Sequence, residues 1–239
     1  MGTRERRQRE FEAREALFLA TARRLIREEG LLTLQMARLA RACDYATGTL
    51  YQHFASKEDL LVALAAWRLQ EHAEQFCRAA AWAATPRERM FALTVVDHLF
   101  HQHHAGFSRL LQYVFTEVVW ESATPERREA LQTELEAPAS AVVGIVEQAI
   151  AEGALAPGRF QPQDLMLGPW ALSAGIQSMQ QARGMLAGLG IDAPTGLLHH
   201  HVQALLNGLG WQPLFDLEDI DALNALVQRV EREVIHVGE

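Results

Sequence analysis

Apolar residues recur along this chain of 239 residues at intervals of three and four, which is the spacing of an amphipathic helix. In the first segment, Phe11, Phe18 and Leu25 follow that spacing up to Gly30, a residue type that commonly ends a helix. No stretch alternates convincingly between apolar and polar residues with a period of two, and there is no internal repeat. The pattern therefore predicts an all-α protein.

The segment Thr33–Lys57 predicts two short helices joined by a tight turn. A first apolar set is interrupted around Asp44, and a second one, Leu50 and Phe54, follows at helical spacing. Aspartate is among the few residue types other than glycine that tolerate the left-handed backbone of such a corner. Thr33 is expected to cap the first of the two helices. This arrangement is that of a helix-turn-helix, whose second helix enters the major groove of DNA.

Small, hydrogen-bonding and aromatic side chains remain on the outer face of the second helix if Leu50 and Phe54 point inward. None of them is a carboxylate that would repel phosphate. Lys57 follows at the start of the next helix, where an ammonium group and a helix N-terminus both favour an anion. The predicted DNA-binding residues are Thr33, Thr47, Gly48, Thr49, Tyr51, Gln52, His53 and Lys57. The alternative is that Tyr51 and His53 only pack a small three-helix unit.

The charge distribution favours nucleic acid as a partner of the N-terminal part alone. The whole chain carries a formal net charge of −8, with 22 basic and 30 acidic residues. Residues 1–60 hold eleven of the basic and nine of the acidic residues, so the positive field is confined to this part. The basic residues before the first apolar position are Arg4, Arg6, Arg7 and Arg9. They form an arm that either reaches DNA or remains a solvated tail.

Residues 49–54, TLYQHF, and residues 56–61, SKEDLL, resemble the TLYxHF and SKExLL signature of the tetracycline-repressor (TetR) family. Gly30, Thr33 and the helix before them match the same pattern, so the resemblance covers roughly residues 10–65. It implies a one-component transcriptional regulator, most often a repressor. The expected architecture is an N-terminal three-helix DNA-binding domain followed by a larger helical domain that binds a ligand and dimerises.

Three consecutive positions depart from the family pattern. Asp44 stands where glycine is usual, Tyr45 where a small aliphatic residue is usual, and Ala46 where a serine commonly caps the recognition helix. Thr47 is the nearest residue that can take over this cap. The departures bear on the orientation of the recognition helix and on its base preference.

The resemblance divides the chain into residues 1–58, a helix-turn-helix domain with the basic arm, and residues 59–239, a helical ligand-binding and dimerisation domain. In the second part, Thr85-Pro86-Arg87-Glu88 has the form of a capping box with proline at the first helical position. A new helix is therefore expected to start there.

The resemblance also places the dimer interface on two helices, at about residues 162–183 and 194–209, packed as a four-helix bundle across a two-fold axis. The first of them is rich in glycine, alanine and serine, which allow helices to approach closely. A C-terminal extension helix is expected at about residues 216–236, with Asp216 as its cap.

A pocket for a small-molecule effector is implied among the helices spanning about residues 86–152, with the 162–183 helix contributing. Such sites are mostly apolar with a few polar groups. The predicted lining residues are His98, His101, Gln112, Phe115, Thr116, Trp120 and Trp170. The expected effector is apolar or aromatic, with a polar group that can meet an imidazole. The alternative is that the aromatic residues among them are only core.

The histidines raise a metal-responsive regulator of the same fold as an alternative. His98, His101 and His104 recur every three residues, so neighbouring members can share a helix face. A closed site needs three or four ligands, and no such set is evident. The second cluster consists of the consecutive histidines at residues 199–201, whose side chains point in different directions around a helix. No metal site and no cofactor are therefore assigned.

Two other function classes fit the sequence less well. A helical-bundle enzyme with a di-iron site needs Glu-x-x-His on two helices, and only Glu233-Val-Ile-His236 matches. The chain has no P-loop, GxSxG or HExxH motif, so no enzymatic activity is predicted. A helical adaptor that has lost DNA binding is disfavoured because Thr49, Tyr51, His53 and Lys57 are intact.

The expected location is the cytoplasm. Cys43 and Cys77 are the only cysteines, the N-terminus is charged, and no apolar run approaches the roughly 18 residues that span a bilayer. The expected partners are double-stranded DNA with a palindromic operator, a small-molecule effector and a second copy of the chain, and no membrane.

Overall fold

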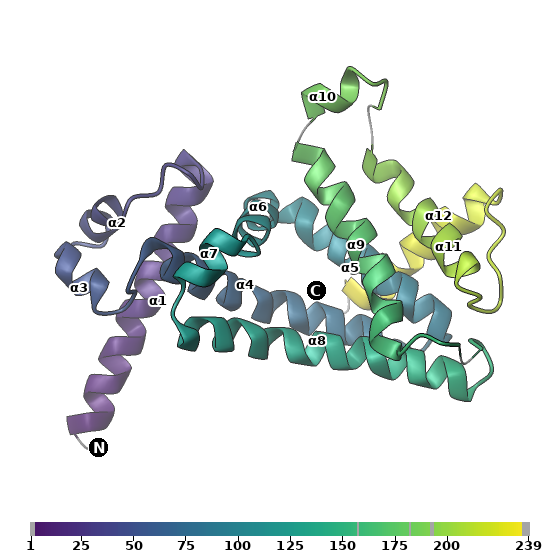
Figure 1. Ribbon diagram of the computed structural model, residues 1–239, viewed down its shortest axis with the longest axis horizontal. Helices are drawn as coiled ribbons and strands as arrows, with labels where there is room; N and C mark the ends of the chain where they lie inside the picture. The colour runs from purple at the N-terminus through teal and green to yellow at the C-terminus, as the bar shows by residue number, and fades with distance from the viewer. Residues whose placement is uncertain (1–2, 157, 182, 192–193, 236–239) are drawn as a thin grey trace. The chain divides into compact units, whose positions relative to one another are not determined.

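The computed structural model describes residues 3–156, 158–181, 183–191 and 194–235, and every regular element among them is a helix (Figure 1). The all-α prediction is confirmed. The elements are α1 (Thr3–Glu29), α2 (Met36–Ala42), α3 (Thr47–Tyr51), α4 (Lys57–Ala80), α5 (Pro86–His103), α6 (Ala105–Val114), α7 (Glu117–Ser122), α8 (Pro125–Ala151), α9 (Pro162–Gln181), α10 (Arg183–Ala187), the 3₁₀-helix η1 (Pro194–Leu197), α11 (Leu198–Gly208), α12 (Ile220–Val230) and the π-helix η2 (Glu231–Ile235). None of the described helices combines the length and the apolar character needed to cross a membrane.

The chain packs into two compact units. The first consists of Met1–Leu69 and Ala105–Thr133, and the second of Gln70–His104 and Glu134–Glu239. These two units are defined by which backbone segments pack together, and not by function. The functional division after residue 58 stays a prediction.

The first unit is built on α1, and its corners have the backbone that the sequence predicts. Gly30 ends α1 with φ of 98°, and Asp44 occupies the corner between α2 and α3 with φ of 59°. Leu50 and Phe54 are fully buried, as the inward-facing pair must be. Phe54 packs with Phe18 of α1, and the two rings meet nearly edge-on at 6.5 Å between centroids.

The predicted cap at Thr33 is wrong. The residue that precedes α2 in the N-cap position is Gln35, which makes no side-chain cap bond. The Thr33 hydroxyl instead lies 2.8 Å from each of the carbonyl oxygens of Glu29 and Gly30, so it satisfies the C-terminal end of α1. The N-cap of α3 is Ala46, also without a side-chain bond, and Thr47 is the first residue of the helix.

A buried carboxylate ties the start of α4 to the start of α8 within the first unit. Asp59 accepts hydrogen bonds from the backbone N–H of Ala55 at 3.1 Å, and from the N–H and hydroxyl of Thr124 at 2.8 and 2.9 Å. One turn further, Arg127 pairs with Glu15 of α1 at 2.8 Å and donates to the carbonyl of His53 at 3.0 Å. The first turn of α8 therefore holds α1 and the end of the helix-turn-helix together.

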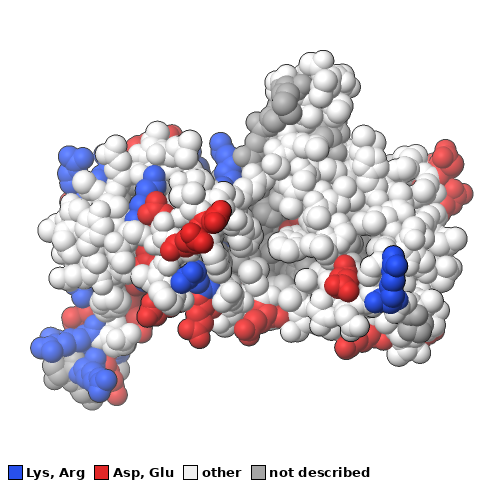
Figure 2. Space-filling view, viewed as in Figure 1, with Lys and Arg blue, Asp and Glu red and all other residues white. Residues whose placement is uncertain are grey.

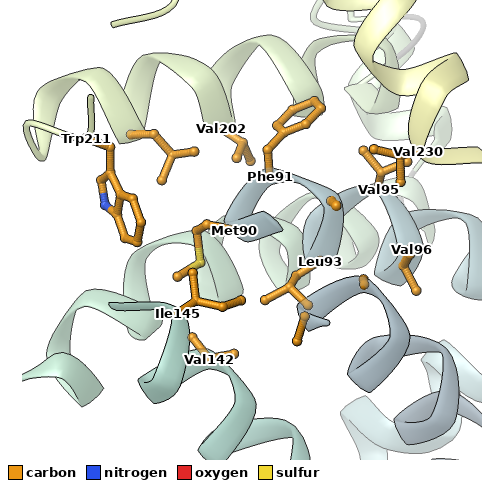
Figure 3. Close-up of a cluster of buried hydrophobic side chains, with 14 of the residues drawn as sticks. Met90, Phe91, Leu93, Val95, Val96, Val142, Ile145, Val202, Trp211 and Val230 are labelled. Carbon is orange, nitrogen blue, oxygen red and sulfur yellow. The ribbon is translucent and has the colours of Figure 1, made fainter. Parts of the chain in front are cut away.

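The second unit has its core around α5. The capping box at its start is confirmed, since the Thr85 hydroxyl accepts from the Glu88 N–H at 3.3 Å and the Glu88 carboxylate accepts from the Thr85 N–H at 3.0 Å. Side chains of α5, α8, α11 and α12 converge there (Figure 3). The labelled members of this cluster are Met90, Phe91, Leu93, Val95, Val96, Val142, Ile145, Val202, Trp211 and Val230.

A buried arginine joins α5 to the end of α11. Arg87 donates to the carbonyl of Trp211 and the side-chain oxygen of Gln203, both at 2.7 Å, and to the side-chain oxygen of Asn207 at 2.8 Å. Burial lowers the pKa of Arg87 to about 10, so the guanidinium remains charged at neutral pH. Neutral oxygens thus satisfy this buried cation.

The last predicted helices differ in detail from their expected bounds. The second dimer helix begins with a 3₁₀ turn, η1, before α11, and residue 182 at the end of the first lies outside the described residues. The extension helix α12 begins at Ile220 because Asp219, not Asp216, caps it by accepting from the Ala222 N–H at 2.8 Å. Asp216 instead accepts from the N–H of Glu218 in the preceding turn.

Candidate functional site

The outer surface of α3 is free of carboxylates. Neither α2 nor α3 has an acidic residue in its first turn. Gly48 and Gln52 are exposed, Tyr51 is 50% exposed, and Thr47 and Thr49 are half-buried. A Cβ atom at Gly48 would meet nothing within 4 Å, so this edge is open. The surface offers hydroxyl, amide and phenol groups that suit phosphates and base edges.

Lys57 is the first residue of α4, and its side chain is half-buried. Its ammonium group lies 3.5 Å from the carbonyl oxygen of Leu32, beyond the usual range of a strong hydrogen bond. The group therefore remains available for an anion beside a helix N-terminus. Thr33 is exposed close to Leu32 in sequence, although its hydroxyl is engaged at the end of α1.

His53 does not lie on the exposed surface, which corrects its expected placement. Its ring stacks on Phe11 of α1 at 3.8 Å between centroids and meets Phe18 edge-on at 5.3 Å. Burial lowers the pKa of His53, although Glu15, whose carboxylate lies 3.6 Å from Nδ1, opposes this effect. His53 packs the end of the helix-turn-helix against α1, so we leave it out of the DNA-binding surface.

The predicted effector residues are divided between the two units. In the second unit, His98 and His101 are buried on α5, whereas Trp170 on α9 is 54% exposed. Those in the first unit are Gln112 on α6, half-buried, Phe115 and Thr116 after it, both exposed, and Trp120 on α7, half-buried. Within the second unit, Trp170 thus differs from the two histidines in its exposure. The proposed pocket lining stays a prediction.

A buried cluster of polar residues around Asp97 was missed by the sequence reasoning. The Nε2 atoms of His72 and His101 each lie 3.3 Å from Oδ1 of Asp97, and the amide of Gln177 donates to Oδ2 at 2.8 Å. Burial raises the pKa of Asp97, but the imidazoles of His101 and His72 outweigh it and hold this pKa well below its usual range. The spacing of Asp97 and His101 was visible in the sequence, whereas His72 and Gln177 come from other helices.

The histidines do not form a metal centre in the part of the chain that the structure describes. No group of three or more His, Cys, Asp or Glu residues there is arranged to hold a metal ion. His98 instead pairs with the Gln102 amide at 2.8 Å and meets His199 of α11 edge-on, with ring centroids 5.3 Å apart. Burial lowers the pKa of His98, and it lowers the pKa of His199 to about 4. This pair is held neutral at neutral pH.

A short helix without carboxylates, placed after a left-handed corner, has the geometry of a helix-turn-helix motif, whose second helix enters the major groove of DNA in proteins that bind it. The sequence profile described as "Bacterial regulatory proteins, tetR family" matches residues 10–64. Residues 10–64 are therefore similar to the DNA-binding domain of the tetR family of bacterial regulatory proteins.

Solved structures share the fold over most of the chain. The fatty acid degradation regulator FadR from Bacillus halodurans is 18% identical, with a TM-score of 0.60 over 81% of this chain and 98% of its own. RolR in complex with resorcinol is 15% identical, with a TM-score of 0.60 over 93% and 96%. AibR in complex with isovaleryl coenzyme A and operator DNA is 23% identical, with a TM-score of 0.53 over 69% and 86%. No curated protein matches the chain in sequence.

Because burial keeps His199 in its neutral form, we expect the free energy of unfolding to decrease as the pH drops below neutral. The folded-state pKa of about 4 lies below the unfolded value of 6.5, so the unfolded state takes up a proton first as the pH drops. The stabilisation is complete above about pH 6.5, and up to about 3 kcal/mol of it is lost by about pH 4. Urea unfolding of the wild type and His199→Phe at pH 7, 6 and 5 measures this, and the variant should lose less stability.

His201→Phe is the matched control, because His201 is exposed on the same helix. It should lose as much stability between pH 7 and 5 as the wild type. If the wild type and His199→Phe lost the same stability between pH 7 and 5, this would contradict the attribution of the pH dependence to His199.

Proposed function

We propose that this protein is a homodimeric repressor that binds a palindromic operator and is released from it by a small apolar or aromatic effector. The observation that carries the proposal is the exposed, carboxylate-free surface of α3 on a well-packed helix-turn-helix. The match of residues 10–64 to a family of bacterial regulatory proteins supports it. The direction of regulation rests on the family resemblance.

Two kinds of contact with DNA are expected from the exposed side chains. Gln52 is suited to a bidentate contact with adenine, and Thr47 and Thr49 to a thymine methyl group or a phosphate. Tyr51 and Lys57 are expected to position the protein on the phosphate backbone. Gly48 allows the backbone of α3 to approach the groove closely, since no side chain intervenes.

Exposed apolar side chains on α9 and η1 support the dimer. Leu167, Trp170 and Met179 of α9 and Leu197 of η1 are 57%, 54%, 51% and 51% exposed. α9 also packs on α11, since a Cβ at Gly168 would lie 3.3 Å from a methyl group of Leu205. The two helices thus pack on each other, and large apolar side chains of α9 and η1 remain exposed. We propose that a second copy of the chain covers these side chains.

An organic effector is favoured over a metal ion. RolR and AibR, which share the fold, are known with resorcinol and with isovaleryl coenzyme A, and each ligand has an aromatic or apolar part. The described residues provide no three-ligand metal group. An effector that binds better to a conformation with mis-spaced recognition helices would lower operator affinity by that difference.

The DNA-binding test starts from selection of bound sequences from random duplex DNA by the wild-type protein. We expect a palindrome, because a two-fold protein reads a two-fold site. Tyr51→Ala and Lys57→Ala should each weaken binding about tenfold or more, and Gln52→Ala should relax preference at one position per half-site. Gln132→Ala, exposed in the same unit, is the control. Unchanged affinity in both Tyr51→Ala and Lys57→Ala would contradict the assignment of this surface.

The dimer test replaces apolar residues on the α9 surface. Leu167→Asp and Trp170→Asp should shift the protein from dimer to monomer in analytical ultracentrifugation, because a buried charge at an apolar interface is costly. Leu214→Asp, at an exposed leucine outside the helices, should remain dimeric. A dimer that survives both α9 substitutions would place the interface elsewhere.

The effector test measures release of the selected duplex by a panel of acyl-coenzyme A esters and small phenols. At least one apolar or aromatic compound should release DNA from the wild type. His98→Ala should weaken this response while leaving affinity for the duplex intact, and His103→Ala, exposed on the same helix, should not. Release by zinc or nickel alone would show that the ligand class is wrong.

A further inference from the structure

One side of α1 faces the helix-turn-helix along its N-terminal half. Phe11 stacks on His53, which lies two residues beyond α3, and Phe18 meets both Tyr45 and Phe54. These contacts fix the rotation of α1 in the first unit. Any side chain that shares the direction of Phe11 therefore points to the side on which α3 lies.

Two arginines before Phe11 share that direction. At about 100° per residue, Arg4 and Arg7 lie within roughly 40° of Phe11 around the helix axis. With a rise of about 1.5 Å per residue, they lie roughly 10 and 6 Å beyond it, past the C-terminal end of α3. Arg6 and Arg9 differ from Phe11 by roughly 140° or more and point to the other side.

The two pairs also differ in their contacts. Arg4 and Arg7 are exposed, and neither has an ion pair or hydrogen bond among the described residues. On the other side, Arg6 pairs with Glu10 at 3.3 Å, and Arg9 donates to the carbonyl of Glu5 at 3.4 Å. Figure 2 shows basic side chains, all of them arginines in this part of the sequence, gathered at the N-terminal end of α1. The predicted basic arm is thus the start of a helix from Thr3 onward.

We infer that Arg4 and Arg7 bind DNA phosphates next to those approached by the C-terminal end of α3, so that the DNA-binding surface extends onto α1. The inference rests on the proposed DNA binding by α3. A guanidinium group suits a phosphate because it presents a planar fork of donors. Phosphate contacts carry no base preference, so they raise affinity and its salt dependence without changing the sequence that is read. Helical structure from Thr3 onward reduces the entropy that a disordered arm would lose on binding.

The test compares two variants that remove the same charge from the two sides of α1. R4Q/R7Q and R6Q/R9Q each lose two arginines within the same exposed turns, and circular dichroism checks that both remain folded. Their affinities for a duplex enriched by the wild-type protein are measured from low to moderate salt. R4Q/R7Q should reduce the slope of log affinity against log salt by about 2 per protomer, and R6Q/R9Q should change it little.

The sequence preference provides a second readout. R4Q/R7Q should lose affinity for the enriched duplex and for a scrambled one by the same factor, whereas Gln52→Ala should not. An equal fall in slope for both arginine variants, or no fall for R4Q/R7Q, would overturn the inference while the proposed function stands. A wild-type protein that enriches no duplex would overturn both.

Discussion

A helix as short as α3 does not hold itself together in water, because isolated helices become stable only at roughly 12–15 residues. Its five residues depend on the burial of Leu50 and, just beyond it, of Phe54, which packs on Phe18 of α1. Two fully buried side chains of this kind contribute roughly 3–6 kcal/mol together. Since the inner face supplies the stability, the outer face can carry glycine and threonine, which suit DNA better than they suit a helix.

Four polar side chains with close partners tie helices together, two in each unit. In the first unit, Asp59 accepts from backbone and hydroxyl donors, and Arg127 pairs with Glu15. In the second, Arg87 meets only neutral oxygens and Asp97 meets two imidazoles. Such groups are costly when they are left unpaired, so each set fixes the relative positions of the helices that contribute to it. They specify the packing within a unit more than they add to its stability.

The candidate site was predicted in its outline and corrected in two places. The pattern of Leu50 and Phe54 was enough to show which face of α3 is buried, and hence that Tyr51 and Gln52 are exposed. It was not enough for Thr33 and His53, because a polar residue has no periodicity of its own. The Thr33 hydroxyl found the free carbonyls at the end of α1, and His53 found the ring of Phe11. Phe11 lies far from His53 in the sequence, and periodicity does not show which helix end the Thr33 hydroxyl serves.

The sequence by itself determined the all-α class, the corner at Asp44, the capping box at Thr85 and the family of the N-terminal domain. Each of these depends on residues within about one or two helical turns of one another, where spacing and backbone preference act directly. Only the tertiary structure decided which polar residues from distant segments meet. His72 joins Asp97 and His101, Arg87 reaches the end of α11, and the stacking of Phe11 on His53 sets the side to which Arg4 and Arg7 point. The physical reason is that these contacts follow from the way whole helices pack, and helix packing depends on all the side chains at once.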